Sequence, residues 1–294
     1  MSHVEEALKK LRKSGHRSPS GRGAQPESTI PLANRKKVVI EGPKHHVSQT
    51  ELIKGGLLAP LDHAMPVADE FRRIKRPLIA NAALEVGNDQ APMNVIMIAS
   101  ALPGAGKTFC AVNLAVSISL ERELNVLLID ADVPKPHISR SFGLGTAPGL
   151  IDLLVDDDSR HFSDFLVRTD LNDIQVLPAG RSHPQATELL ASGRMSDIVG
   201  ELARRYPDRI IILDSPPLLV TSEAQAVASQ VGQIAVIVEA GQTSQQVLSQ
   251  TLETLDPNKA INLILNKSRQ WAQTRYYGGD YSYGQSYGQG SDQH

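Results

Sequence analysis

The stretch Met93–Thr108, MNVIMIASALPGAGKT, decides how the chain is expected to fold. An apolar, β-branched run from Val95 to Ala99 leads into a sharp turn. The turn leads into Gly106, Lys107 and Thr108, which open a helical pattern, FCAVNLAVSISL. A strand, a glycine-rich loop and a helix in this order predict a P-loop, a cradle for the phosphates of a nucleotide.

Each residue type in this loop has a physical task. Gly104 and Gly106 allow the backbone to curl around an anion with its N–H groups pointing inward. Lys107 brings a positive charge to the β- and γ-phosphates, and the Thr108 hydroxyl is placed to bind Mg²⁺. A dinucleotide-binding loop would need a third glycine where Phe109 stands. The predicted ATP-binding residues of the loop are Pro103, Gly104, Ala105, Gly106, Lys107, Thr108 and Phe109.

Composition places the chain among ordinary globular proteins. It has 294 residues, of which 41% are hydrophobic and 21% charged, with a net charge of −2 that gives no reason to expect a nucleic-acid partner. Cys110 is the single cysteine, so no intramolecular disulfide can form. No apolar run approaches the roughly 18 residues of a membrane span, and no apolar signal core opens the sequence. A cytoplasmic location is expected.

The sequence divides into four segments. Residues 1–13 predict a short amphipathic helix that could lie on a membrane, dock on a partner or pack on its own domain. Residues 14–48 have the composition of a flexible linker, and residues 49–270 that of a folded domain. Residues 271–294 form a tail rich in Gly, Ser and Gln, which cannot bury a core.

The folded segment alternates strand and helix patterns. Helical patterns are clearest at Thr187–Tyr206 and Ser244–Leu255. This alternation predicts an α/β fold with a doubly wound, mostly parallel sheet, whose ligands bind at the carboxyl ends of the strands. The predicted strands are Val95–Ala99, Val126–Ile129, Ile174–Leu177, Ile210–Leu213, Ile234–Val238 and Ile261–Leu265.

A helix is expected at residues 64–84, with Pro77 expected to kink or break it. Glu70, Arg73 and Arg76 are spaced three residues apart, which places the three side chains along one face of this helix. By pattern alone, a solvated charged face is the favoured interpretation of this spacing.

Three carboxylates follow predicted strands. Asp130 and Asp132 come at the end of Val126–Ile129, and Asp214 comes at the end of Ile210–Leu213. Apolar strands that end in Asp beside a P-loop are typical of Mg²⁺ sites, so Thr108, Asp214 and Asp130 are the candidate metal ligands.

These segments carry a specific resemblance. SALPGAGKT, LLIDADVPKP and IIILDSPP resemble the Walker A, A′ and B motifs of the bacterial tyrosine kinases, which are P-loop NTPases of the deviant-Walker type. VLPAGRSHPQATELLASGRM resembles the segment that follows in that family. ADEFRRIKRPLIANA resembles the subgroup of tyrosine autokinases linked to exosortase and exopolysaccharide loci. Val133-Pro134-Lys135 departs from the family, which often has an arginine-bearing stretch there.

The resemblance implies an ATP- and Mg²⁺-dependent tyrosine autokinase that regulates exopolysaccharide synthesis or export. Lys107, Asp130, Asp132 and Asp214 would be its catalytic residues, with Asp132 favoured over Asp130 as the base. Asn266 is where related P-loop proteins contact adenine. The E-x-x-R-x-x-R run at Glu70, Arg73 and Arg76 matches the family's self-association motif, and the tail matches its autophosphorylation cluster, Tyr276, Tyr277, Tyr281, Tyr283 and Tyr287.

The same resemblance implies partners. A flexible tail can reach a neighbour's site, so phosphorylation in trans within a ring-like homo-oligomer is expected. A separate transmembrane activator or polysaccharide co-polymerase would hold the protein at the inner face of the plasma membrane. Phosphorylation of other proteins is also open on the sequence.

Two other functions remain open on the sequence. A switch ATPase of the partition or septum-positioning type shares the fold and the carboxylates, but its signature lysine is replaced here by Leu102. An ATP-binding scaffold for a membrane polysaccharide co-polymerase would need no such intact set of acids.

Overall fold

The computed structural model describes residues 43–60, 63–84, 87, 90–156 and 161–268. The predicted N-terminal helix, most of the predicted linker and the tyrosine-rich tail therefore lie outside the described residues. No helix among the described segments combines the length and the apolar character that crossing a bilayer would require.

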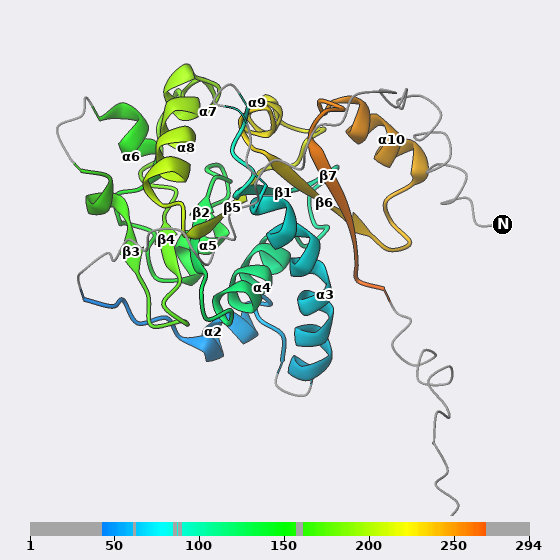
Figure 1. The fold of residues 1–294 in the computed structure, drawn as a ribbon, viewed down its shortest axis with the longest axis horizontal. Helices are drawn as coiled ribbons and strands as arrows, with labels where there is room; N and C mark the ends of the chain where they lie inside the picture. The colour runs from blue at the N-terminus through cyan, green and yellow to red at the C-terminus, as the bar shows by residue number, and fades with distance from the viewer. Residues whose placement is uncertain (1–42, 61–62, 85–86, 88–89, 157–160, 269–294) are drawn as a thin grey trace, which may run out of the picture.

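A seven-stranded sheet forms the centre of the described chain, in the order β3-β4-β2-β5-β1-β6-β7 (Figure 1). All neighbouring strands run parallel except β3, which is antiparallel to β4. The strands are β1 Val95–Ser100, β2 Asn125–Asp130, β3 Val167–Arg168, β4 Gln175–Leu177, β5 Arg209–Asp214, β6 Gln233–Glu239 and β7 Ala260–Asn266. The predicted doubly wound parallel sheet is confirmed, and only the short edge strand β3 was not foreseen.

Helices cover both faces of the sheet. The helices are α2 Gln49–Lys54, α3 Ala64–Ala82, α4 Lys107–Ser119, α5 His137–Ser141, α6 Leu150–Val155, α7 Ala186–Leu190, α8 Gly193–Arg205, α9 Ser222–Gln230 and α10 Gln245–Glu253, with a 3₁₀ turn at Phe162–Phe165. Residues from α2 to α5 share one hydrophobic cluster with one face of the sheet, and residues from α6 to α10 share a second cluster with the other face.

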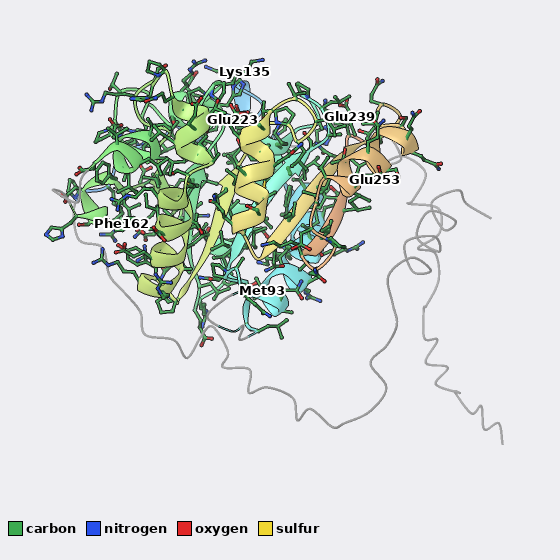
Figure 2. All side chains as sticks on the ribbon, turned by 90° about the horizontal axis from the view of Figure 1, so that it is seen from above. Met93, Lys135, Phe162, Glu223, Glu239 and Glu253 are labelled. Atoms are coloured by element: carbon green, nitrogen blue, oxygen red, sulfur yellow. The ribbon has the colours of Figure 1, made fainter. Side chains whose placement is uncertain are left out.

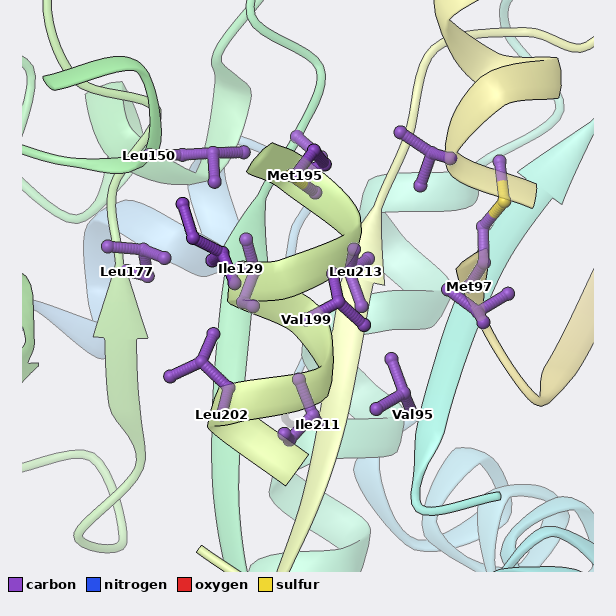
Figure 3. Packing of buried hydrophobic residues seen from close by; sticks show 14 of the residues in the cluster. Val95, Met97, Ile129, Leu150, Leu177, Met195, Val199, Leu202, Ile211 and Leu213 are labelled. Carbon is purple, nitrogen blue, oxygen red and sulfur yellow. The ribbon is translucent and has the colours of Figure 1, made fainter. Parts of the chain in front are cut away.

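Alternate residues of each strand enter different clusters. Val95 and Met97 of β1 pack on the side of α8, whereas Ile96 and Ile98 pack on the side of α4. Figure 3 shows Met195 and Val199 of α8 lying over this first face. Because successive side chains of a strand point to opposite faces, a continuous apolar run is what a strand covered on both sides requires.

The single helix predicted at Thr187–Tyr206 is wrong in one respect, because the chain forms two helices there. α7 ends at Leu190 and α8 begins at Gly193. Between them Ser192 accepts a hydrogen bond from the Met195 amide and donates one from its hydroxyl to the Leu189 carbonyl. A serine that caps the next helix in this way competes with a continuous helical ladder.

α3 continues through Pro77, so the predicted break does not occur. Proline removes one hydrogen bond, but anchors on both sides of it hold the helix against α4. Phe71 lies 6.2 Å from the ring of Phe109, and Leu78 is fully buried. Lys75 is buried too, and its ammonium donates to the Ser117 carbonyl near the end of α4.

Phe71→Ala should lower the free energy of unfolding by about 3 kcal/mol, because it removes a buried aromatic ring and leaves a cavity between α3 and α4. Urea denaturation would measure this change. Arg72→Ala, at an exposed position on the same helix, is the matched control and should change stability by about 0.5 kcal/mol or less. Equal effects of the two substitutions would contradict the packing described for α3.

Candidate active site

The loop between β1 and α4 has the backbone that the sequence predicts. Gly104 and Gly106 have φ angles of +87° and +93°, in the left-handed region that favours glycine. Gly106 directly precedes α4, and its carbonyl accepts the Cys110 amide at 3.0 Å. The first N–H groups of α4 therefore open toward the loop, where they have no partner within the helix.

The three predicted acids come to the same edge of the sheet as this loop. Asp130 and Asp214 end β2 and β5 and face each other in the sheet register, and Asp214 also pairs in register with Ile98 of β1. Figure 2 shows Lys135 and Glu239 at this carboxyl edge and Met93, which precedes β1, at the opposite edge. The parallel pairing of β2, β5 and β1 thus places the acids beside the P-loop.

Asp214 is fully buried, and neither of its carboxylate oxygens has a hydrogen bond of regular geometry. Its pKa is raised to about 8, chiefly by burial and also by the charges of Asp130 and Asp132, against the lowering effects of the nearby Thr108 hydroxyl and Lys107. A buried carboxyl group without a partner is costly. Thr108 and Lys107 face this carboxyl group, and this arrangement is typical of a carboxylate that binds a cation.

Asp130 differs from Asp214 in being held on one side. Its Oδ2 accepts both the amide and the hydroxyl of Ser139, at 2.8 and 2.7 Å, while its Oδ1 is buried without a partner. Burial raises its pKa to about 6. The Ser139 hydroxyl in turn accepts the Ala179 amide at 2.9 Å. Sequence reasoning missed Ser139, because a serine in a short helix carries no pattern that links it to a strand-end acid.

Asp132 and Lys107 influence each other's charge. Burial raises the pKa of Asp132, and Lys107 lowers it, as do Lys135 and His137. Burial lowers the pKa of Lys107, and Asp214 and Asp132 raise it. The lysine is 8% exposed, so its ammonium depends on these two carboxylates for compensation of its charge.

The remaining predicted site residues lie in three places. The Asn266 side-chain amide donates to the Ala105 carbonyl at 2.8 Å, so this residue reaches the P-loop, and its contact with adenine stays a prediction. The Phe109 ring packs on Phe71, which leaves its backbone for a nucleotide. Glu70, Arg73 and Arg76 are exposed on α3. The five tail tyrosines lie outside the described residues.

Within the described residues, no group of three or more His, Cys, Asp or Glu side chains could hold a metal ion by itself. Mg²⁺ usually takes one or two carboxylates and completes its octahedron with water and substrate phosphates. A complete protein cage of the kind that binds Ca²⁺ or Zn²⁺ is therefore not part of the described site.

The buried acids predict that the nucleotide-free protein loses stability as the pH rises. In the unfolded chain these groups titrate near their ordinary pKa of about 4, whereas in the folded chain Asp130 titrates at about 6 and Asp214 at about 8. Between about pH 5 and about pH 8 the folded state therefore binds more protons than the unfolded state. The free energy of unfolding falls over this range as the pH rises. Thermal melts in EDTA should show a weaker fall for Asp214→Asn; equal slopes for both proteins would contradict the raised pKa.

The sequence and the fold of this chain are similar to those of known proteins. Residues 93–267, which run from the P-loop strand to the end of β7, match the AAA domain family. The chain is 30% identical over 199 residues to the tyrosine-protein kinase YwqD of Bacillus subtilis, a match that covers 66% of this chain and 82% of YwqD. It is 29% identical to the succinoglycan biosynthesis transport protein ExoP of Rhizobium meliloti, with 82% of this chain covered but only 28% of ExoP.

Among solved structures, the kinase domain of VpsO superposes with a TM-score of 0.58 at 30% identity, over 71% of this chain and all of that domain. The relative YwqD is covered over most of its length at this identity, and the chain is therefore a member of the bacterial tyrosine kinases.

Proposed function

We propose that this protein is an ATP-dependent tyrosine autokinase that phosphorylates its own C-terminal tyrosine cluster in trans. The observation that carries the proposal is the position of Lys107 beside Asp132 and Asp214 at the carboxyl edge of the sheet. Asp130 lies next to Asp214 in the sheet register. Phosphoryl transfer needs positioning and neutralisation of charge more than covalent chemistry. A buried lysine and three acids beside a P-loop supply both.

The nucleotide would lie in the loop from Pro103 to Phe109, with Asn266 near the base. Lys107 would bind the β- and γ-phosphates. The unpaired oxygens of Asp214 and the Thr108 hydroxyl suit Mg²⁺, with Asp130 behind them. The metal, when bound, neutralises phosphate charge, and it would bring the raised pKa of Asp214 down so that the carboxyl group is ionised at neutral pH.

The geometry favours Asp132 as the base. Both Ser139 bonds fix Asp130, which is fully buried, whereas Asp132 is 8% exposed and lies beside Lys107. An incoming tyrosine hydroxyl would reach Asp132 more easily. Its proton passes to the carboxylate as the phenolic oxygen bonds to the γ-phosphorus and the bond from that phosphorus to the leaving ADP oxygen breaks. Asp130 would orient the metal's water ligands.

The cellular role follows from the relatives. ExoP is named as a succinoglycan biosynthesis transport protein, and the match covers only part of it. We infer that this chain regulates exopolysaccharide synthesis or export and works with a separate transmembrane activator or polysaccharide co-polymerase. Such a partner would hold it at the inner face of the plasma membrane, where other proteins could also become substrates.

Incubation with ATP and Mg²⁺ should place phosphate on tail tyrosines, and Lys107→Met should abolish the reaction without unfolding the domain. The substitution removes the charge that faces the phosphates, so the loss should exceed about a hundredfold. Mass spectrometry with and without phosphatase treatment would locate the phosphate among Tyr276, Tyr277, Tyr281, Tyr283 and Tyr287.

Three results would count against this proposal. Rapid release of free phosphate without phosphotyrosine would favour a switch ATPase. Nucleotide binding with neither product would favour a scaffold. A Lys107→Met protein that incorporates labelled phosphate at the wild-type rate would contradict the assignment of the P-loop.

Self-association should depend on the exposed face of α3. Burial raises the pKa of Glu70 and Arg73 lowers it, while Phe71 and Leu78 on the opposite face fix the helix to the domain. An exposed ion pair contributes only about 0–1 kcal/mol, but pairs repeated around a closed ring act together. We propose that the unphosphorylated chain forms a ring through Glu70, Arg73 and Arg76, and that phosphates on the tail dissociate it by repulsion.

Light scattering tests this assembly. The Lys107→Met protein should form a large oligomer whose mass falls as salt is added. Replacement of Glu70, Arg73 and Arg76 by Ala should give a folded monomer or small oligomer, as should phosphorylation of the wild type. Arg72→Ala, on the same helix but outside the motif, is the control and should keep the large mass. Identical masses for all samples would refute both the interface and the switch.

A further inference from the structure

The carbonyl groups of the P-loop are held from behind by the end of β7. The Lys267 ammonium donates to the Gly104 carbonyl at 2.7 Å, and the Asn266 amide donates to the next carbonyl, Ala105, at 2.8 Å. These two donors are consecutive in sequence, and so are their two acceptors. A single turn at the end of β7 therefore binds two successive peptide groups of the loop.

This contact fixes where the loop's N–H groups point. In a trans peptide the C=O and the N–H point in opposite directions, and the described chain has no cis peptide bond. A Gly104 carbonyl held by Lys267 therefore turns the Ala105 N–H to the opposite side of the loop. An Ala105 carbonyl held by Asn266 does the same for the Gly106 N–H. Backbone N–H groups of this kind are what a P-loop presents to phosphate oxygens.

Lys267 is itself held in place. Its ammonium pairs with Glu239 at the end of β6, at 3.0 Å, and the Ala240 amide donates to the Asn266 carbonyl at 2.9 Å. Its backbone has a φ of +58°, which a residue with a side chain adopts at a cost of about 1 kcal/mol. The ends of β6 and β7 thus keep an unfavourable backbone conformation from which the side chain reaches the loop.

We propose that Lys267 is a positioning residue of the nucleotide site, which sets the P-loop amides toward the phosphates before a nucleotide arrives. The inference rests on the proposed binding of ATP at this loop. Lys267 bonds to the back of the loop and is half exposed, so water screens its charge and its orienting bond is the larger effect. Without that bond, a nucleotide must order the loop as it binds.

Loss of Lys267 should affect the kinetics differently from loss of Lys107. A disordered loop weakens binding, but a saturating nucleotide restores its order, so the KM for ATP rises while kcat is nearly kept. Lys267→Met should raise the Kd of N-methylanthraniloyl-labelled ADP with Mg²⁺ and the KM for ATP about tenfold each, the size of one hydrogen bond to a charged group. kcat should change less than about twofold.

The chain offers a matched control at the other end of the same strand. Lys259 precedes β7 and donates to two carbonyls, Ser229 and Val231, at 2.8 and 2.7 Å, far from the P-loop edge. Lys259→Met removes a lysine–carbonyl contact of the same kind and should leave both constants at the wild-type value. Amide hydrogen exchange of the nucleotide-free proteins should be faster at residues 104–107 in Lys267→Met only.

A double substitution separates orientation from charge. Lys267→Met leaves Glu239 without its partner near the loop, and that charge could repel phosphates. The double variant, Lys267→Met with Glu239→Gln, removes this charge but does not restore the hydrogen bond to the Gly104 carbonyl. The Kd should therefore stay raised. Lys267→Arg, which keeps a charged donor, should recover most of the affinity.

The possible results contradict either this inference or the proposed function, but not both. A wild-type Kd for Lys267→Met, or full recovery in the double variant, would overturn the inference. An equal change in Lys259→Met would show a general effect of lysine loss and would overturn it as well. Absence of nucleotide binding by the wild-type chain, with Lys107→Met unchanged from it, would instead overturn the proposed function.

Discussion

The site depends on the compensation of one buried ammonium group by carboxylates. Lys107 lies at the start of α4 with Asp132 and Asp214 close enough to raise its pKa against the effect of burial. The acids in turn carry raised pKa values, chiefly because they are buried, and neighbouring carboxylates add to this effect at Asp130 and Asp214. Neither sign of charge would be tolerated there alone. Because three acids share this edge with one lysine, the edge carries excess negative charge when the acids are ionised. A metal cation can neutralise this charge.

The P-loop is supported from two sides by parts of the chain that are distant in sequence. α3 packs on α4 through the Phe71–Phe109 contact near the loop and through Lys75, which pairs with Glu121 at 2.7 Å just beyond the far end of α4. β7 binds the loop from behind through Asn266 and Lys267. The helix that carries Glu70, Arg73 and Arg76 thus contacts α4, and the strand β7 contacts the P-loop itself.

The fold was predictable because its signals are local and repeated. Strands buried on both faces read as continuous apolar runs, and the six that were predicted agree with the structure to within one or two residues at each end. The short strand β3 and the division between α7 and α8 were not predictable in this way. β3 has two residues, too few for a pattern, and the division depends on a serine whose capping bond competes with an equally good helical pattern.

The sequence by itself determined the chemistry of the site: the loop glycines, Lys107, Thr108 and the three acids follow from residue type and from their places at strand ends. Tertiary structure alone decided how these groups differ. Asp130 and Asp132 lie two residues apart in the sequence, yet only Asp130 is shown to bind Ser139, because α5 turns back over the end of β2. Lys75 and Lys267 look like ordinary surface lysines in the sequence. Folding brings each ammonium to a backbone carbonyl more than 40 residues away in the sequence, where it donates a hydrogen bond.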